Sequence, residues 1–326
     1  MPSLLDLTRQ VDSLSKIPVD SYTLTTHNGI PIGSILPSTL LLLISQQGSL
    51  FSVSESDKTV TITVESLTER NYAFASLTES LLKNNLLNMK DQIRHELYTV
   101  YDGSSKPYVH IERALCPHLG VIMYGIHITG FIKSLTNYYF WVPRRSPTKQ
   151  TYPNMLDQTV AGGLGYPYGP FDTCIKECTE EAGLPADYVT SKLTSVGSVS
   201  YYFSEDGRAQ PEIQYVYDLN MTPDNVDDAI NDYLLNESTY SIKESHGAWS
   251  TEKGLMIPKN IDGEACNFEL LSSDQAREKL LKGEFKPNCG LVLIEFMIRH
   301  GMISPDEPGY LEMYAHCHSQ LPFPSR

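Results

Sequence analysis

The most constraining feature of this 326-residue chain is one stretch, residues 162–184, which reads GGLGYPYGPFDTCIKECTEEAGL. Glu177, Glu180 and Glu181 are spaced i, i+3 and i+4, so on a helix their carboxylates share one face. Apolar and small residues at the complementary spacing predict the buried stripe of the same helix: Phe171, Cys174, Ile175, Cys178 and Ala182. The stretch therefore predicts a helix with one dry face and one acidic face.

The residues at the two ends of this helix agree with the periodicity. Pro170 suits the first helical turn, and Gly183 suits the left-handed residue that ends a helix. Ahead of the helix, the adjacent Gly162 and Gly163 let backbone approach a ligand without a Cβ in the way. Carboxylates on one helical face repel one another, and a hard divalent cation such as Mg2+ is their natural counter-ion. A solvated acidic helix face is the alternative.

The same stretch resembles the Nudix box, in which a Gly, five residues, a Glu and seven residues precede Arg-Glu-apolar-x-Glu-Glu-x-Gly-apolar. Residues 177–184 fill the second half, and Lys176 stands where the family has Arg. With Gly162 as the motif glycine, the first glutamate position is Tyr168; with Gly163, the loop is one residue short. In the family that glutamate mostly supports the loop. The resemblance thus implies an intact metal-binding half on an altered loop.

A narrower resemblance runs from about residue 90 to the C-terminus. Segments such as YGIHITGFI, FWVPRRSPTKQTYPNMLDQTVAGGL and DGEACNFELL are similar, in that order, to the thiamine-pyrophosphokinase-related Nudix hydrolases of fungi and plants. The string TYPNMLDQTVAGG is the most specific part. Members of that group hydrolyse thiamine-type diphosphates, including damaged forms such as oxythiamine diphosphate, to the monophosphate. The resemblance implies a metabolite-repair hydrolase with the Nudix α/β/α sandwich, built on a mixed sheet and preceded by a small α/β leader domain.

The resemblance also implies the roles of site residues. The metal, Mg2+ with Mn2+ as its substitute, would be held by backbone carbonyl and carboxylate oxygens: Gly162 or Gly163, Glu177, Glu180, Glu181 and Glu264. Glu177 would complete the metal shell or orient the attacking water, and Lys176 would hold Glu177 by a salt bridge. Which of the box carboxylates is the general base stays open.

The charge balance bears on the substrate. A net charge of −14 argues against a nucleic-acid or anionic-membrane surface, because both need a basic footprint. A small diphosphate substrate would need local cations, and the loop PRRSPTK offers Arg144, Arg145 and Lys149. We hypothesise that Arg144 or Arg145 contacts the diphosphate, since Arg binds phosphate bidentately; a solvated loop is the alternative. Tyr202 is a candidate for stacking on a flat substrate ring, with a core position as the alternative.

The remaining patterns set the domain organisation. Residues 1–107 are expected to form the leader domain and residues 108–326 the hydrolase domain. Acidic residues 222–259 lack clean periodicity and are predicted to be an insertion, either a mobile lid or a partly ordered loop. Helices are expected at 4–11, 72–84, 274–281 and 290–300, and strands at 60–64, 124–132, 138–142, 196–203 and 212–219.

Other signals concern compartment and assembly. The six cysteines show no paired CxxC spacing and are expected to be reduced core residues. The N-terminal residues have no apolar run of signal or membrane-span length, so a cytoplasmic protein is expected. Both a monomer and a homodimer fit.

Three rival functions stay open. One is hydrolysis of another Nudix substrate, such as a nucleoside diphosphate derivative or coenzyme A. Another is a module that binds thiamine diphosphate without cutting it, which the absent first glutamate and Lys176 make conceivable. The third is a Nudix-type isomerase of isoprenoid diphosphates, against which the long thiamine-group similarity argues.

Overall fold

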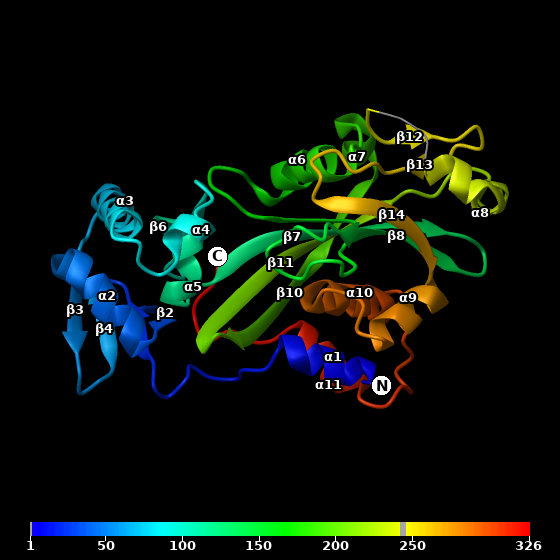
Figure 1. Cartoon of the computed structure of the whole chain (residues 1–326). Helices are drawn as coiled ribbons and strands as arrows, with labels where there is room; N and C mark the ends of the chain where they lie inside the picture. The colour runs from blue at the N-terminus through cyan, green and yellow to red at the C-terminus, as the bar shows by residue number, and fades with distance from the viewer. Residues whose placement is uncertain (1, 242–245) are drawn as a thin grey trace.

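A mixed sheet with helices on both faces lies at the centre of the computed structural model, which describes residues 2–241 and 246–326 (Figure 1). The strand order is β10-β11-β7-β8-β14, and β9 pairs with β7 off this path. Strands β7 and β11 run parallel, and the other neighbouring pairs run antiparallel. The bounds are β7 (Met123–Lys133), β8 (Tyr138–Arg145), β9 (Val160–Gly163), β10 (Leu193–Glu205), β11 (Arg208–Asn220) and β14 (Ala265–Ser272). The predicted α/β fold with a mixed sheet is confirmed.

The two helical layers bury both faces of this sheet. Along β7, Ile126, Ile128 and Ile132 pack toward α6 (Pro170–Ala182), α7 (Ala186–Lys192) and α8 (Val226–Ser241). Phe131, on the opposite face, packs with α9 (Ser273–Leu281) and α10 (Pro287–Arg299), beside which lie α1 (Leu4–Val11) and α11 (Tyr310–Cys317). Because both faces are covered, β7 is almost entirely buried. In the described part of the chain, no helix is long and apolar enough to cross a membrane.

The N-terminal part forms a second sheet of order β2-β1-β4-β3, seen on the left in Figure 1. The strands of this sheet are β1 (Tyr22–Thr25), β2 (Pro31–Ile35), β3 (Phe51–Ser54) and β4 (Thr59–Ile62). Strands β5 (Leu97–Tyr101) and β6 (Pro107–Glu112) form a separate antiparallel pair. The helices of this part are α2 (Pro37–Gln47), α3 (Leu67–Lys83), α4 (Met89–Gln92) and α5 (Cys116–Leu119). The domain boundary expected between residues 107 and 108 falls at the start of β6, whereas the hydrophobic core of the N-terminal part includes residues up to Val121. Helix α1 packs instead against α10 and α11 of the larger part.

The predicted helices at 4–11, 72–84, 274–281 and 290–300 are confirmed, as are the five predicted strands. The prediction of a partly ordered loop at 222–259 is wrong for most of its length. Helix α8 lies in it, and Tyr233 meets Trp141 edge to face at 5.3 Å between ring centroids. Two short strands follow, β12 (Trp249–Ser250) and β13 (Met256–Ile257). Residues 242–245 of the segment lie outside the described residues.

The 222–259 segment also donates hydrogen bonds to the C-terminal end of α6. The Ala248 amide donates to the Gly183 carbonyl at 3.0 Å, and the Lys259 amide donates to the Ala182 carbonyl at 2.8 Å. Both acceptors lie at the C-terminus of α6, where helix carbonyls lack intrahelical partners. The described part of the segment is therefore a structural support of the helix that carries the glutamates.

Candidate metal and phosphate site

Helix α6 presents the three glutamates as its sequence predicts. It begins at Pro170 and ends at Ala182, and the following Gly183 has a φ of 63°, the left-handed conformation expected after a helix. Cys174, Cys178 and Ala182 form the buried side of the helix. Phe171, which the spacing placed in the buried stripe, is 40% exposed, and the buried side of the helix begins at Thr173 and Cys174 instead. On the acidic face, Glu177 lies against Gly162 of β9, and Glu181 accepts a hydrogen bond from the amide of Ala161 in the same strand.

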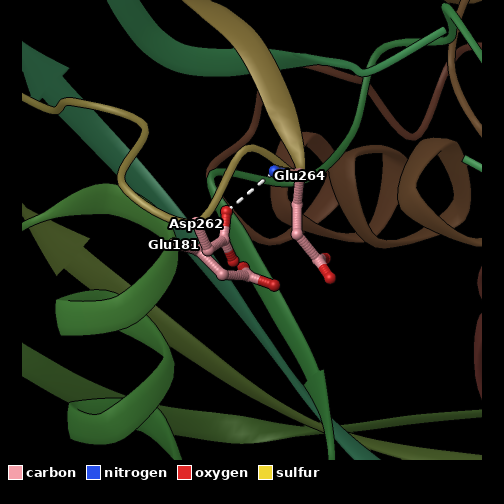
Figure 2. Close-up of side chains that lie close together, drawn as sticks. All are labelled: Glu181, Asp262 and Glu264. Atoms are coloured by element: carbon pink, nitrogen blue, oxygen red, sulfur yellow. Dashed lines mark hydrogen bonds between the residues drawn. The ribbon is translucent and has the colours of Figure 1, made fainter. Parts of the chain in front are cut away.

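Three carboxylates from two segments converge beside this helix. Oxygen atoms of Glu181, Asp262 and Glu264 lie within 4.8 Å of one another (Figure 2). Glu181 comes from α6, and the other two come from the turn that leads into β14. The turn is fixed by the Glu264 amide, which donates to the Asp262 Oδ1 at 2.8 Å, and Glu181 Oε2 accepts from the Ala161 amide at 3.2 Å. Such a set of oxygen atoms is what Mg2+ and Mn2+ bind in proteins.

The electrostatics of Glu181 test whether the set suits a cation. Burial raises the pKa of Glu181 well above its usual value, and the neighbouring Glu177 and Asp157 raise it further. Within the described residues, Glu181 has no ion pair, so nothing there would compensate its negative charge when it ionises. A buried carboxylate without a counter-charge is costly. A divalent cation bound by this carboxylate would remove that cost, so the residues present fit a metal.

The other two glutamates of α6 share a lysine. Lys176 Nζ lies 3.0 Å from Glu177 Oε1 and 2.9 Å from Glu180 Oε2, which includes the predicted salt bridge to Glu177. Glu177 is enclosed, with 15% of its side chain exposed, whereas 54% of the Glu180 side chain is exposed. A Cβ at Gly162 would lie 2.7 Å from the Glu177 carboxyl carbon, so only glycine at this position leaves room for the carboxylate. The structure thus keeps Glu180 outside the group formed by Glu181, Asp262 and Glu264.

The hairpin of β5 and β6 supports the glycine-rich loop. A Cβ at Gly163 would overlap the Tyr98 hydroxyl, so this glycine lets the hairpin approach the loop. The loop is tied to β5 by a bridge between Tyr98 and Gly165 and by the Tyr166 amide, which donates to the Leu97 carbonyl at 2.7 Å. The N-terminal part of the chain is therefore in direct contact with the loop next to the carboxylates.

A pocket opens beside the three carboxylates and contains three cationic side chains. Arg145 forms an ion pair with Asp157, and Lys149 forms one with Glu264. The third cation is Lys286. The full lining is Pro143, Arg145, Lys149, Asp157, Gln158, Thr159, Ala161, Glu181, Asp262, Glu264, Ala265, Phe268 and Lys286. Four of these residues, Asp157, Gln158, Thr159 and Ala161, belong to the string TYPNMLDQTVAGG.

Two residues proposed from sequence as substrate contacts lie away from this pocket. Arg144 is not part of its lining, because the neighbouring residues of a strand point to opposite faces, and it pairs with Glu269 at 3.0 Å and Glu284 at 3.7 Å. Tyr202 is 1% exposed and packed in the interior, so it offers no face for a ring. Arg145 does line the pocket, but it is bound to Asp157 and to the Tyr152 carbonyl, at 3.0 Å from the latter.

Sequence reasoning missed three residues of the site. Asp262 stands in the DGE segment, where only Glu264 was selected, and Asp157 stands inside the specific string. Lys286 follows β14 by a helix and a turn, and no local motif marks it. Only the fold brings these residues together with α6.

Comparison with known proteins gives the family. No family model matches the chain. It is 30% identical over 272 residues to Nudix hydrolase 20, chloroplastic, of Arabidopsis thaliana, and 33% identical over 224 residues to Nudix hydrolase 24, chloroplastic, of the same plant. The chain belongs to the Nudix hydrolase family. The aligned parts cover 83% and 68% of this chain but 63% and 53% of the two plant proteins.

The chain is also similar to one further relative and to one solved structure. The chain is 37% identical over 322 residues to the Saccharomyces cerevisiae protein named "Uncharacterized protein YJR142W", covering 93% of this chain and 85% of that one. Among solved structures, DR0079 from Deinococcus radiodurans aligns with a TM-score of 0.40 at 16% identity, over 61% of this chain and 98% of that chain. The two plant relatives carry the word chloroplastic in their names, so the cytoplasmic location of this chain stays a prediction.

Proposed function

We propose that this Nudix chain is a Mg2+-dependent hydrolase that cuts the diphosphate of thiamine-type compounds, oxythiamine diphosphate among them, to the monophosphate and phosphate. The hydrolase part of the proposal rests on one observation: Glu181, Asp262 and Glu264 converge at a pocket that is also lined by cationic side chains. The thiamine part is supported by the similarity of the 151–163 string, four residues of which line that pocket.

Water attacks phosphorus slowly unless the negative charge of the diphosphate is neutralised and the water is positioned. A divalent ion bound at Glu181, Asp262 and Glu264 would supply charge neutralisation and a more acidic water. The chain supplies the rest. Glu177 is enclosed, and burial raises its pKa while Lys176 opposes this effect. An enclosed carboxylate next to the metal group is suited to orient a water or accept its proton, so Glu177 is the general-base candidate that the geometry favours.

The N-terminal part has a role in this proposal. Its hairpin, through Tyr98, fixes the loop that carries Gly162 and Gly163. That loop carries the backbone carbonyl expected to join the metal group. The loop lacks the box glutamate at Tyr168, and its support comes from strand β5 instead. The altered first half of the box is therefore compatible with an ordered site.

The proposal is tested by hydrolysis. Purified wild-type protein and its Glu181→Gln variant would be incubated with Mg2+ and with thiamine, oxythiamine, nucleoside and coenzyme A diphosphates, following release of monophosphate and phosphate. The matched control is Glu278→Gln, which changes an exposed carboxylate on α9 that pairs with Lys282. Turnover of the thiamine-type compounds that Glu181→Gln reduces at least 100-fold, with Glu278→Gln unaffected, is the expected result.

The other outcomes select the rivals. Preference for nucleoside or coenzyme A compounds would overturn the thiamine part and leave a Nudix hydrolase of another substrate. Binding of thiamine diphosphate without turnover of any compound would overturn the hydrolase reading and favour the binding module.

A further inference from the structure

Lys286 differs from the other two cations of the pocket in having no anionic partner. Arg145 is bound to Asp157, and Lys149 is bound to Glu264. Lys286 forms no ion pair within 4.0 Å and no side-chain hydrogen bond with any residue that the structure describes. Its charge is thus available to a ligand in the pocket.

The backbone holds Lys286 in a fixed place. Its amide donates to the Leu156 carbonyl at 2.8 Å, and the Leu156 amide donates to the Glu284 carbonyl at 2.8 Å. Lys286 is also the residue that precedes Pro287 at the first turn of α10. Fixed backbone at the root of a long side chain lowers the entropy lost when the amine binds a ligand. The positive end of the α10 dipole lies at the same place and favours negative charge there.

Lys286 stays charged in this environment. Burial acts to lower the pKa of its amine, but the neighbouring Cys289 and Asp157 outweigh burial, so the pKa is raised overall. Asp157 is itself occupied, since it forms the ion pair with Arg145 and accepts the Cys289 thiol hydrogen at 2.7 Å. Asp157 therefore stabilises the charge on Lys286 from a distance without binding the amine directly.

The formal charges of the pocket show what Lys286 contributes. Its lining has four carboxylates, Asp157, Glu181, Asp262 and Glu264, and three cations, so its formal net charge is −1. A divalent ion makes the net charge +1. Without Lys286 the same pocket would be neutral with the ion bound and would lose its attraction for an anionic substrate.

We propose that Lys286 contacts the phosphate oxygens of the substrate in this pocket and is the phosphate-binding cation of the enzyme. This proposal rests on the proposed function for the identity of the ligand as a diphosphate, and it takes over the role that the sequence suggested for Arg144 or Arg145. Lysine binds phosphate as a point charge, so it tolerates diphosphates attached to different groups. Selection among rings must then come from other residues.

The test uses the full chain and imidodiphosphate, a diphosphate analogue that resists hydrolysis, in the presence of Mg2+. Titration calorimetry would compare wild type with Lys286→Met, Lys286→Arg and the control Lys282→Met. The control removes an exposed lysine of the same helical region that pairs with Glu278. We expect Lys286→Met to weaken imidodiphosphate binding about 10- to 100-fold, as for loss of a charged hydrogen bond. Lys286→Arg should keep most of the affinity, and Lys282→Met should bind as wild type does.

Folding and Mg2+ binding of each variant would be checked by circular dichroism and by Mn2+ titration, which Lys286→Met should leave intact. In steady-state kinetics with a hydrolysed diphosphate, Lys286→Met should raise KM more than it lowers kcat. Wild-type affinity in a folded Lys286→Met variant would overturn the proposal, as would failure of the wild type to bind imidodiphosphate.

The two proposals fail separately. Loss of imidodiphosphate binding in Lys286→Met, in a protein that hydrolyses nothing, would support the role of Lys286 and overturn only the hydrolase function. Hydrolysis that Glu181→Gln abolishes and Lys286→Met leaves unchanged would support the function and overturn the role of Lys286.

Discussion

Lys149 forms an ion pair with Glu264, one of the three carboxylates gathered for a cation. The lysine therefore neutralises Glu264 when no metal is bound, and it must give way if the metal uses the same oxygen. Both side chains are partly exposed, at 25% for Lys149 and 51% for Glu264, so the pair is worth little and is easily exchanged.

The first prediction follows from this competition. In Lys149→Ala, the metal no longer displaces a partner of Glu264, so Mn2+ should bind about 1.5- to fivefold more tightly, corresponding to ~0.2 to 1 kcal/mol for an exposed pair. Calorimetric titration of Mn2+ into the protein measures this, with Lys282→Ala as the control that breaks an exposed pair elsewhere. Weaker Mn2+ binding in Lys149→Ala would show instead that the lysine orients Glu264 for the metal.

A second prediction separates stability from metal binding at Glu181. Burial raises the pKa of this carboxyl, so its ionised form is disfavoured in the folded state. A raised carboxyl pKa means that stability is full below the unfolded pKa and is lost as pH rises toward the folded pKa. In EDTA at neutral pH, Glu181→Gln should therefore melt at the same temperature as wild type or above it.

With Mg2+ the order should reverse. Wild type gains about 2.7 kcal/mol when the ion is present at 100 times its dissociation constant, and Glu181→Gln gains much less. Thermal melts of both proteins in EDTA and in Mg2+ give the comparison. A variant that melts well below wild type in EDTA would contradict it, because Glu181 would then be a structural residue.

The sequence predicts α6 and its acidic face well, because periodicity and end signals are local properties of the chain. It also leads to Glu181 and Glu264, which the family pattern marks. It fails for Lys286 and Asp157, because their place depends on how distant segments, such as α10 and strand β7, pack together, and no short pattern records that. For a similar reason, the sequence points to Arg144 or Arg145 as the phosphate contact and gives no sign of Lys286. The acidic composition shows that a diphosphate substrate needs a cationic side chain nearby. Only the fold shows that Arg144 is already paired with Glu269, whereas Lys286 has no ion pair among the described residues.

The prediction of a partly ordered loop at residues 222–259 was wrong for a different reason. Its charged residues obscure the helical pattern of α8, whose buried side is carried by Ala229, Ile230 and Tyr233. Those residues become interpretable only beside Trp141 of β8, against which Tyr233 packs. Burial against a distant strand thus supplied the order that local propensity did not indicate.

A third prediction concerns the contact between the hairpin and the glycine-rich loop. In Gly163→Ala the new methyl group overlaps the Tyr98 hydroxyl, so the loop or the hairpin must move. We expect a loss of about 1 to 3 kcal/mol in the free energy of unfolding, typical of an overpacked site, and at least tenfold lower activity. Urea unfolding and hydrolysis assays measure the two effects.

Two further variants make that test specific. Gly169→Ala is the matched control, since its Cβ would meet nothing closer than Asp172 Oδ2 at 3.5 Å. Tyr98→Leu combined with Gly163→Ala removes the overlap and should recover part of the lost stability. Normal stability and activity in Gly163→Ala alone would show that the loop does not depend on this contact.

The last prediction concerns acid stability and His127, a buried residue of β7 that is 3% exposed. Its Nδ1 has no partner among the described residues. Burial, and then the nearby Lys286, lower the pKa of His127 to about 3. The folded state therefore keeps this histidine neutral, while the unfolded chain binds a proton below about pH 6.5. Because the unfolded state binds more protons in this range, stability falls as pH falls from about 6.5 toward 3.

Between pH 7 and pH 5, His127 should account for a loss of about 2 kcal/mol in the free energy of unfolding, at ~1.4 kcal/mol per pH unit once the unfolded histidine is charged. Urea unfolding at the two pH values would show this loss in wild type and a smaller one in His127→Asn. His95→Asn, at an exposed position, should behave as wild type does. An equal pH dependence in wild type and His127→Asn would mean that another group, such as His118 with its pKa lowered to about 4 by burial, carries the acid sensitivity.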